Sequence, residues 1–117
     1  MAKIRLQFEM DKQSEMAPTA ALIQQKLAQL PEVEKAKATP EEARMGVVEA
    51  ATIIGGVVIL ARNTGNLIDE IRKLIPKFKA LADDLRSRGV KNVYVEVGTR
   101  RVDITELNDA DAAKLVE

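Results

Sequence analysis

The stretch MGVVEAATIIGGVVILA at residues 45–61 is the most apolar run in the sequence, and the fold depends on the structure that it adopts. Its only charged residue is Glu49, and the pair Gly55-Gly56 lies near its middle. A helix that is apolar on every side has to be covered on every side, by other elements of the domain, by a partner or by a membrane.

A helix is the interpretation that the flanking residues favour. Thr39-Pro40-Glu41-Glu42 supplies a hydroxyl at the N-cap, proline at the first helical position and a carboxylate at the third, which can bond back to the cap. A clear helical pattern also follows from Leu67 onward. We therefore expect a helix that begins near Pro40 and continues through the apolar run.

A β-hairpin is the alternative. Thr52-Ile53-Ile54 and Val57-Val58-Ile59 are rich in β-branched residues, which favour strands, and Gly55-Gly56 fits a two-residue turn between them. Two glycines also cost a helix about 1 kcal/mol each relative to alanine. Local propensity therefore favours the hairpin, whereas the residues on both sides favour the helix.

Length and composition predict a single domain over residues 1–117 with an aliphatic core. The chain is 46% hydrophobic and 31% charged, which is ordinary for a globular protein, and its aromatic residues are Phe8, Phe78 and Tyr94. The 18 basic and 18 acidic residues balance. A generic nucleic-acid binder has a basic excess and stacking rings, so we expect no nucleic-acid partner.

The first part of the chain predicts a strand and a helix. Lys3–Met10 alternates polar and apolar residues, which indicates a strand and not a signal peptide; together with the lack of cysteine this favours the cytoplasm. Pro18 opens a helix that runs to about Gln29 and is ended by Pro31. The segment Glu32–Ala38 has little periodicity and is interpreted as a short edge strand.

A long amphipathic helix is predicted next. Apolar residues recur at three- and four-residue steps from Leu67 to Leu85, with charged residues between them. Pro76 removes one backbone hydrogen bond and predicts a bend, and Gly89 fits the C-cap.

Residues 91–105 contain the clearest hairpin pattern. Gly98-Thr99 fits a two-residue type II′ turn, and this register places Val95 opposite Val102, so that core residues face core residues. Asn108 is positioned to cap a short final helix.

The predicted order of elements is β-α-(β)-α-α-β-β-α, which is an α+β fold. The N-terminal strand and the C-terminal hairpin would form a small, mainly antiparallel sheet. This sheet would pack against a long, kinked or broken central helical segment.

The types of residue present argue against an enzyme. The absence of histidine and cysteine removes the commonest general base, the commonest metal ligands and the thiol nucleophiles. The carboxylate pairs Asp69-Glu70 and Asp83-Asp84 lie on the polar side of the predicted helix and are interpreted as a solvated face. We expect no catalytic residue, no cofactor and no metal site.

Glu49 has two interpretations, because a carboxylate among apolar residues should not be buried without a partner. It points to solvent near the helix start, or it pairs with a basic residue of this chain or of a partner. Part of the apolar run is a candidate oligomer or partner interface, because a 117-residue domain does not readily cover so much aliphatic surface and the two glycines allow another backbone to approach closely. The residues of this interface are Glu49, Ile53, Ile54, Gly55, Gly56, Val57 and Val58.

A membrane anchor is a further possibility for residues 50–61. A spanning helix needs about 20 apolar residues. This uncharged window lies between Glu49 and Arg62 and is too short to span a membrane, so only a peripheral anchor competes with burial in the domain or in an oligomer.

Two segments resemble a known family. MGVVEA at residues 45–50 opens the apolar run, and VYVEVGTRRVDITELNDADAAKLVE at 93–117 contains a hairpin of the type V-x-V-E-x-G-x-R-x-V and an Asp-rich helix. Both are similar to the effector-associated constant component family of prokaryotic NTP-dependent conflict systems. The resemblance extends over most of the chain in layout, and over residues 45–61 and 93–117 in sequence.

This resemblance implies an apolar central helix between the first strand and helix and the final hairpin and helix. It also implies a function, that of a constant, non-enzymatic adaptor in antiviral defence, encoded beside variable effectors such as proteases. We therefore expect a homo-oligomer, an effector protein, or both, as partners. A small peripheral membrane protein anchored by residues 50–61 is the alternative.

Overall fold

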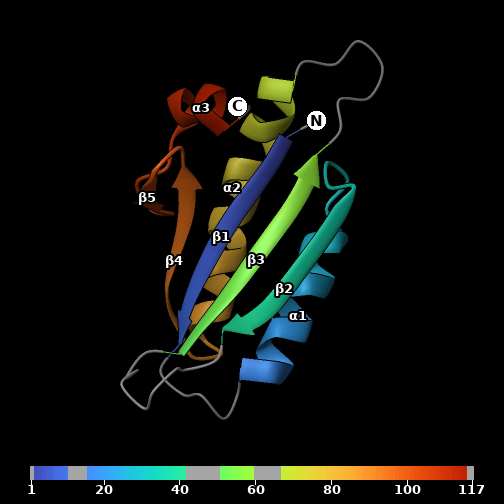
Figure 1. The fold of residues 1–117 in the computed structure, drawn as a ribbon, viewed down its shortest axis with the longest axis vertical. Coiled ribbons are helices and arrows are strands. Elements are labelled where there is room, and N and C mark those ends of the chain that lie inside the picture. Colours follow the sequence, from blue (N-terminus) through green and yellow to red (C-terminus); the bar gives the residue numbers. More distant parts are fainter. Residues whose placement is uncertain (1, 11–15, 42–50, 60–66, 116–117) are drawn as a thin grey trace.

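A five-stranded antiparallel sheet forms the centre of the fold, and two long helices pack on it (Figure 1). The computed structural model describes residues 2–10, 16–41, 51–59 and 67–115. The strands are β1 (Ala2–Met10), β2 (Lys35–Glu41), β3 (Ala51–Ile59), β4 (Val90–Val97) and β5 (Arg100–Asp103). The helices are α1 (Met16–Ala28), α2 (Leu67–Arg86), the 3-10 helix η2 (Asp109–Asp111) and the short α3 (Ala112–Leu115).

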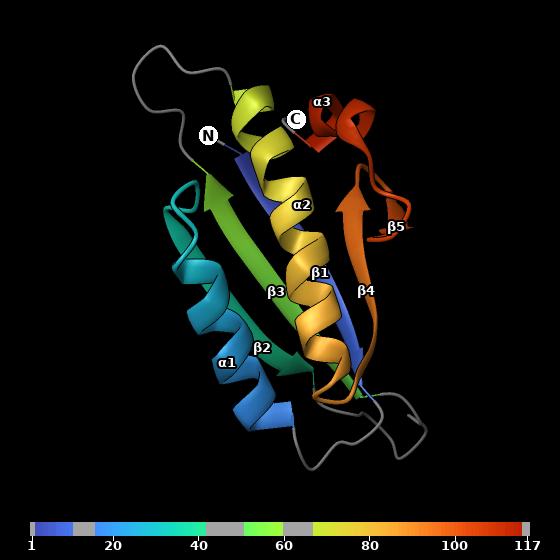
Figure 2. The same cartoon turned by 180° about the vertical axis from the view of Figure 1, so that it is seen from behind.

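The strand order β2-β3-β1-β4-β5 defines the topology. From β1 to β4 the elements follow the order β-α-β-β-α-β of a ferredoxin-like fold, and β5 and α3 extend it. Figure 2 shows α1 and α2 on the same face of the sheet. The predicted α+β class is confirmed, with a larger sheet than the sequence indicated.

Residues 51–59 form neither a helix nor a hairpin, so both interpretations of this segment are wrong. They form one strand, β3, which runs straight through Gly55-Gly56, with Gly55 opposite Leu6 and Gly56 opposite Arg5. β-branched residues pack well on a pleated surface, and pairing with β1 and β2 on either side gives the segment its backbone partners. Glu49 lies outside the described residues.

The expected N-cap at Thr39-Pro40 is also wrong, because both residues belong to β2. This edge strand continues three residues beyond the predicted end at Ala38. The backbone N–H of Ala38 points away from β3 and donates to Gln24 Oε1 of α1 (3.0 Å). Pro40, two positions further on, faces the same way, where the sheet needs no N–H from it.

α2 agrees with its sequence pattern. It is a single helix that runs through the exposed Pro76, and it ends before Gly89, whose φ of 97° suits glycine at a helix C-terminus. Its apolar stripe is buried in the core. The buried residues of this helix are Ile71, Leu74, Ile75, Phe78, Ala82 and Leu85.

The hairpin and the final cap are confirmed as well. Val95 lies opposite Val102, and Gly98 has a φ of 64°, the positive value that the turn requires. The side chain of Asn108 accepts from the N–H of Ala110 (2.9 Å), while Asp111 bonds back to the N–H of Asn108 (3.1 Å). This capping box starts η2, which continues into α3.

Candidate functional site

The sheet face that α1 and α2 leave open is the candidate functional site. Among the described residues, no helix packs over this face (Figures 1 and 2). The strand register determines which side chains it presents, because every second residue of each strand points to the same side. On β2, β3 and β1 these are Lys35, Lys37, Thr39, Thr52, Ile54, Gly56, Val58, Lys3, Arg5, Gln7 and Glu9.

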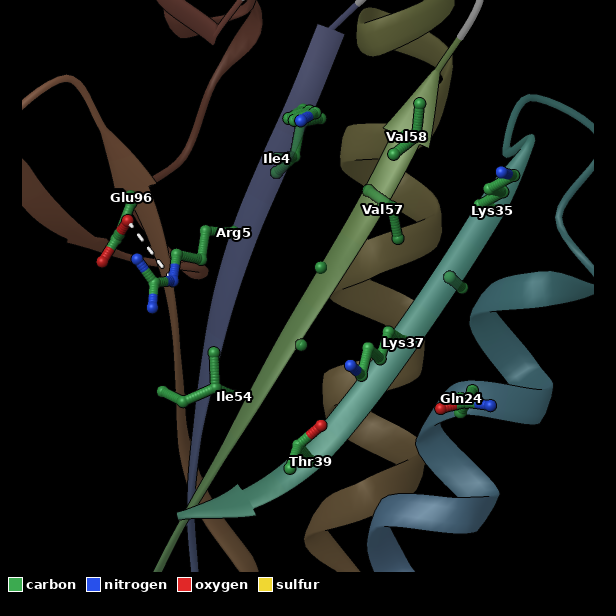
Figure 3. A pocket seen from close by; sticks show the side chains of 14 residues that line it. Ile4, Arg5, Gln24, Lys35, Lys37, Thr39, Ile54, Val57, Val58 and Glu96 are labelled. Atoms are coloured by element: carbon green, nitrogen blue, oxygen red, sulfur yellow. Dashed lines mark ion pairs between the residues drawn. The ribbon is translucent and has the colours of Figure 1, made fainter.

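A hollow of about 1040 Å³ lies over β3 on this face (Figure 3). Gly56 lines it, and a Cβ atom at this position would meet no atom of the described residues within 4 Å. Ile54 and Val58 flank the hollow along the strand and are only half-buried. The glycine therefore leaves a gap between two half-buried apolar side chains.

Among the described residues, four cations line the hollow, two on each neighbouring strand: Lys3 and Arg5 on β1, and Lys35 and Lys37 on β2. All four are exposed. Glu96 is the carboxylate that the described residues contribute to the lining, and its Oε2 lies 4.0 Å from Arg5 Nε (Figure 3). Of the four cations, only Arg5 is ion-paired with a described residue. The hollow thus combines an apolar floor with a positive rim.

On the other half of the open face, over β4 and β5, polar side chains contact one another. The guanidinium of Arg101 lies 4.3 Å from the centre of the Tyr94 ring, and Arg101 Nη1 donates to Gln7 Oε1 (3.1 Å). Asn92 Nδ2 donates to Glu9 Oε1 (3.1 Å). Arg101 therefore occupies a ring face that base stacking would need.

The hydroxyl of Tyr94 stays protonated in this network. Burial raises its pKa, and the negative charge of Glu9 raises it further. Asp103 acts in the same direction and Arg101 in the opposite one. The residue is thus a neutral, anchored part of the sheet surface.

Both edges of the sheet are poorly suited to adding a strand from another chain. On β2, Gln24 takes the outward N–H of Ala38, and Pro40 has none. On the opposite edge, β5 has only four residues. Of the surfaces of the sheet, the open face is therefore better suited to a partner than either edge.

The predicted interface residues divide between the two faces of β3. Ile54, Gly56 and Val58 lie on the open face, where they line the hollow. The side chains of Ile53 and Val57 point into the core beneath the helices, and Gly55 is buried beside Phe8. Glu49 lies outside the described residues.

The cationic rim was missed by sequence reasoning, although the sequence carries a signal for it. In KIRLQFEM and KAKAT, polar or basic residues occupy every second position, so a strand interpretation places Lys3 with Arg5, and Lys35 with Lys37, on one face. Their convergence follows only from the strand order, which puts β2 and β1 on either side of β3.

Other kinds of site find little support in the part of the chain that the structure describes. Its Asp and Glu residues form no group of three or more that could hold a metal ion. None of its helices is both long and apolar enough to cross a membrane. No family model, curated protein or solved structure matches the chain. The function is therefore inferred from the chain's own residues and from the resemblance noted above.

Proposed function

We propose that the chain is a non-enzymatic adaptor of the cytoplasm that binds another protein through the open sheet face. The observation that supports this proposal is the hollow over Gly56, where the apolar side chains of Ile54 and Val58 are only half-buried between cations. Antiparallel sheets that face water normally present polar residues on that side. Apolar residues at these positions are better explained by a partner that covers them.

The resemblance to the effector-associated constant component family gives the adaptor its setting. Such a protein would form homo-oligomers or recruit an effector, for instance a protease, in a prokaryotic conflict system. The lysines around the hollow, which have no ion-pair partner among the described residues, would orient the partner and speed its association, since charges around an interface act chiefly on specificity and on-rate.

Light scattering and co-purification with the products of neighbouring genes test the proposal. We expect the unmodified chain to form a dimer or a stable complex, and Ile54→Asp to weaken it by about tenfold or more, because a charge would replace central apolar surface. Ala80→Asp is the matched control, because Ala80 is exposed on α2 in the opposite layer. Melting temperatures show whether both variants fold.

Two results would contradict the adaptor. The first is a monomer at all concentrations that also binds none of the neighbouring gene products. The second is association that requires lipid vesicles, which would favour the membrane-anchor alternative. In the fold observed here such an anchor would have Ile54 and Val58 available, because Ile53 and Val57 are buried in the core.

A further inference from the structure

The separation of the two strands that flank β3 is close to the diameter of an α-helix. β2 and β1 lie on either side of β3, so the lysines at 35 and 37 and the cations at 3 and 5 stand two strand spacings apart. With neighbouring strands about 4.8 Å apart, the backbones that carry the two cationic rows are separated by about 10 Å. An α-helix with its side chains has a diameter of about 10–12 Å.

The spacing along β3 also matches a helix. Ile54 and Gly56 are two residues apart, as are Gly56 and Val58, and each step spans about 6.6 Å of strand. Side chains four residues apart on a helix are separated by about 6 Å along its axis. One apolar side chain of a helix laid along β3 would enter the gap at Gly56, and those one turn before and after it would contact Ile54 and Val58.

The charges indicate which kind of helix fits. Lys3, Lys35 and Lys37 are exposed and have no ion-pair partner among the described residues, so carboxylates on both flanks of the helix would meet cations on both sides. Glu96 already faces Arg5 and makes that corner less favourable for a further carboxylate. We propose that the hollow over Gly56 is a docking groove for a partner protein's amphipathic helix, with an apolar stripe and acidic residues on both flanks.

This inference rests on the proposed adaptor function and names the chemistry of the partner. A single-stranded nucleic acid fits less well, because Arg101 covers a face of the Tyr94 ring and the chain has no net charge. A second copy also fits less well. The long helices of the described residues, α1 and α2, already use their apolar sides within their own fold.

The test uses a synthetic peptide of about 18 residues, or five helical turns. It has leucine at every third or fourth position on one face, glutamate on both flanks and a fluorescent label. A second peptide carries lysine in place of each glutamate. We expect the acidic peptide to bind and the basic one to bind at least about tenfold more weakly, with an affinity for the acidic peptide that falls as salt is added.

Gly56→Val is the decisive variant. Valine would fill the gap that receives the central leucine, and it has room, because a Cβ at this position meets none of the described atoms within 4 Å. We expect a melting temperature that is unchanged or higher, since valine favours strands, and a loss of about tenfold or more in peptide affinity. The double variant Lys35→Glu/Lys37→Glu should shift the preference towards the basic peptide.

Several outcomes would overturn the groove. One is that Gly56→Val binds the acidic peptide as tightly as the unmodified chain does. Another is that the unmodified chain prefers the basic peptide. A third is that an unlabelled oligothymidine or anionic vesicles compete with the acidic peptide for the hollow. If the chain assembles with itself or with a neighbouring gene product and Gly56→Val leaves that assembly intact, the docking groove is contradicted and the adaptor function is still supported. If it binds no peptide and no protein, both fail.

Discussion

The two faces of β3 place identical residues in opposite surroundings. Ile53 is 0% exposed beneath the helices, whereas Ile54 is half-buried on the open face. Gly55 lies against Phe8, whereas Gly56 borders open space. Residue type therefore does not separate the core of this protein from its candidate docking surface. Position along β3 separates them, because its odd-numbered residues face the core and its even-numbered residues face the open side.

The largest expected difference between the two faces is in the isoleucines. Ile53→Ala should lower the free energy of unfolding by about 2–5 kcal/mol, because it removes methyl groups from a packed core and leaves a cavity. Ile54→Ala should cost less than about 1 kcal/mol, because its side chain is still partly in water. Urea denaturation of both variants measures this, and equal losses would mean that the open face is covered in solution.

The glycines give the next largest effect. A Cβ at Gly55 would lie 2.9 Å from Phe8 Cε1 and 3.8 Å from Leu27 Cδ1, so Gly55→Ala should destabilise the fold by about 1–3 kcal/mol through overpacking. Gly56→Ala should instead stabilise it by up to about 1 kcal/mol, because alanine has less backbone freedom in the unfolded chain. Opposite signs in thermal denaturation support the comparison. Two changes of the same sign would contradict the assigned facing of the pair.

These positions also show why the sequence predicted one helix correctly and mistook β3 for another. The helix at Leu67–Arg86 has charged residues opposite its apolar stripe, so its period of 3.6 is visible in the sequence. β3 carries apolar residues on both faces, so no alternation of polarity marks it as a strand. The cap-like Thr39-Pro40 and the helical pattern downstream then favoured the wrong structure.

The candidate site was predictable only in part, for a related reason. Ile54 and Val58 make β3 hard to recognise because they are apolar on a face that is open to solvent, which is also what makes them candidates for contact with a partner. The cations could not be assigned to the site from the sequence. Lys35 and Lys3 are far apart in the chain, and only the pairing of β2 and β1 with β3 brings them to the same hollow.

The hairpin glycine Gly98 shows the effect of backbone conformation apart from the effect of free space around the side chain. Gly98, like Gly56, has no atom of the described part of the chain within 4 Å of the position of a Cβ, but its φ is +64°. Gly98→Val should therefore destabilise the fold by about 1–2 kcal/mol through backbone strain alone, while Gly56→Val does not. If the melting temperature of Gly98→Val equalled that of the unmodified chain, a positive φ at the turn would be ruled out.

The smallest effect concerns an ion pair on the helix side, compared with one on the open face. Lys77 Nζ of α2 lies 2.8 Å from both carboxylate oxygens of Glu32, whose side chain is only 8% exposed. Burial by itself raises the pKa of Glu32, but hydrogen bonds from Lys77 and from its own backbone, with the positive charges of Lys77 and Lys73, outweigh burial and lower it. The pair on the open face, Arg5–Glu96, is longer and more exposed.

A lowered pKa fixes the sign of the pH dependence. The Glu32 carboxylate stabilises the folded chain above the ordinary glutamate pKa of about 4.3, and this contribution is lost as the pH falls through the lower folded value. Lys77→Met should cost about 1 kcal/mol at pH 7, because it leaves a buried carboxylate without its main partner while Lys77 itself is 38% exposed. When the pH is lowered below about 5, the variant should also lose less stability than the parent, because its Glu32 pKa is no longer held down.

Arg5→Met is the matched control. It should change neither the stability at pH 7 nor its acid dependence measurably, since the partner of Arg5 is 4.0 Å away and both side chains are exposed to water. Urea titrations at a series of pH values measure both variants, and an acid dependence of Lys77→Met identical to that of the parent would show that Glu32 is not stabilised by this pair.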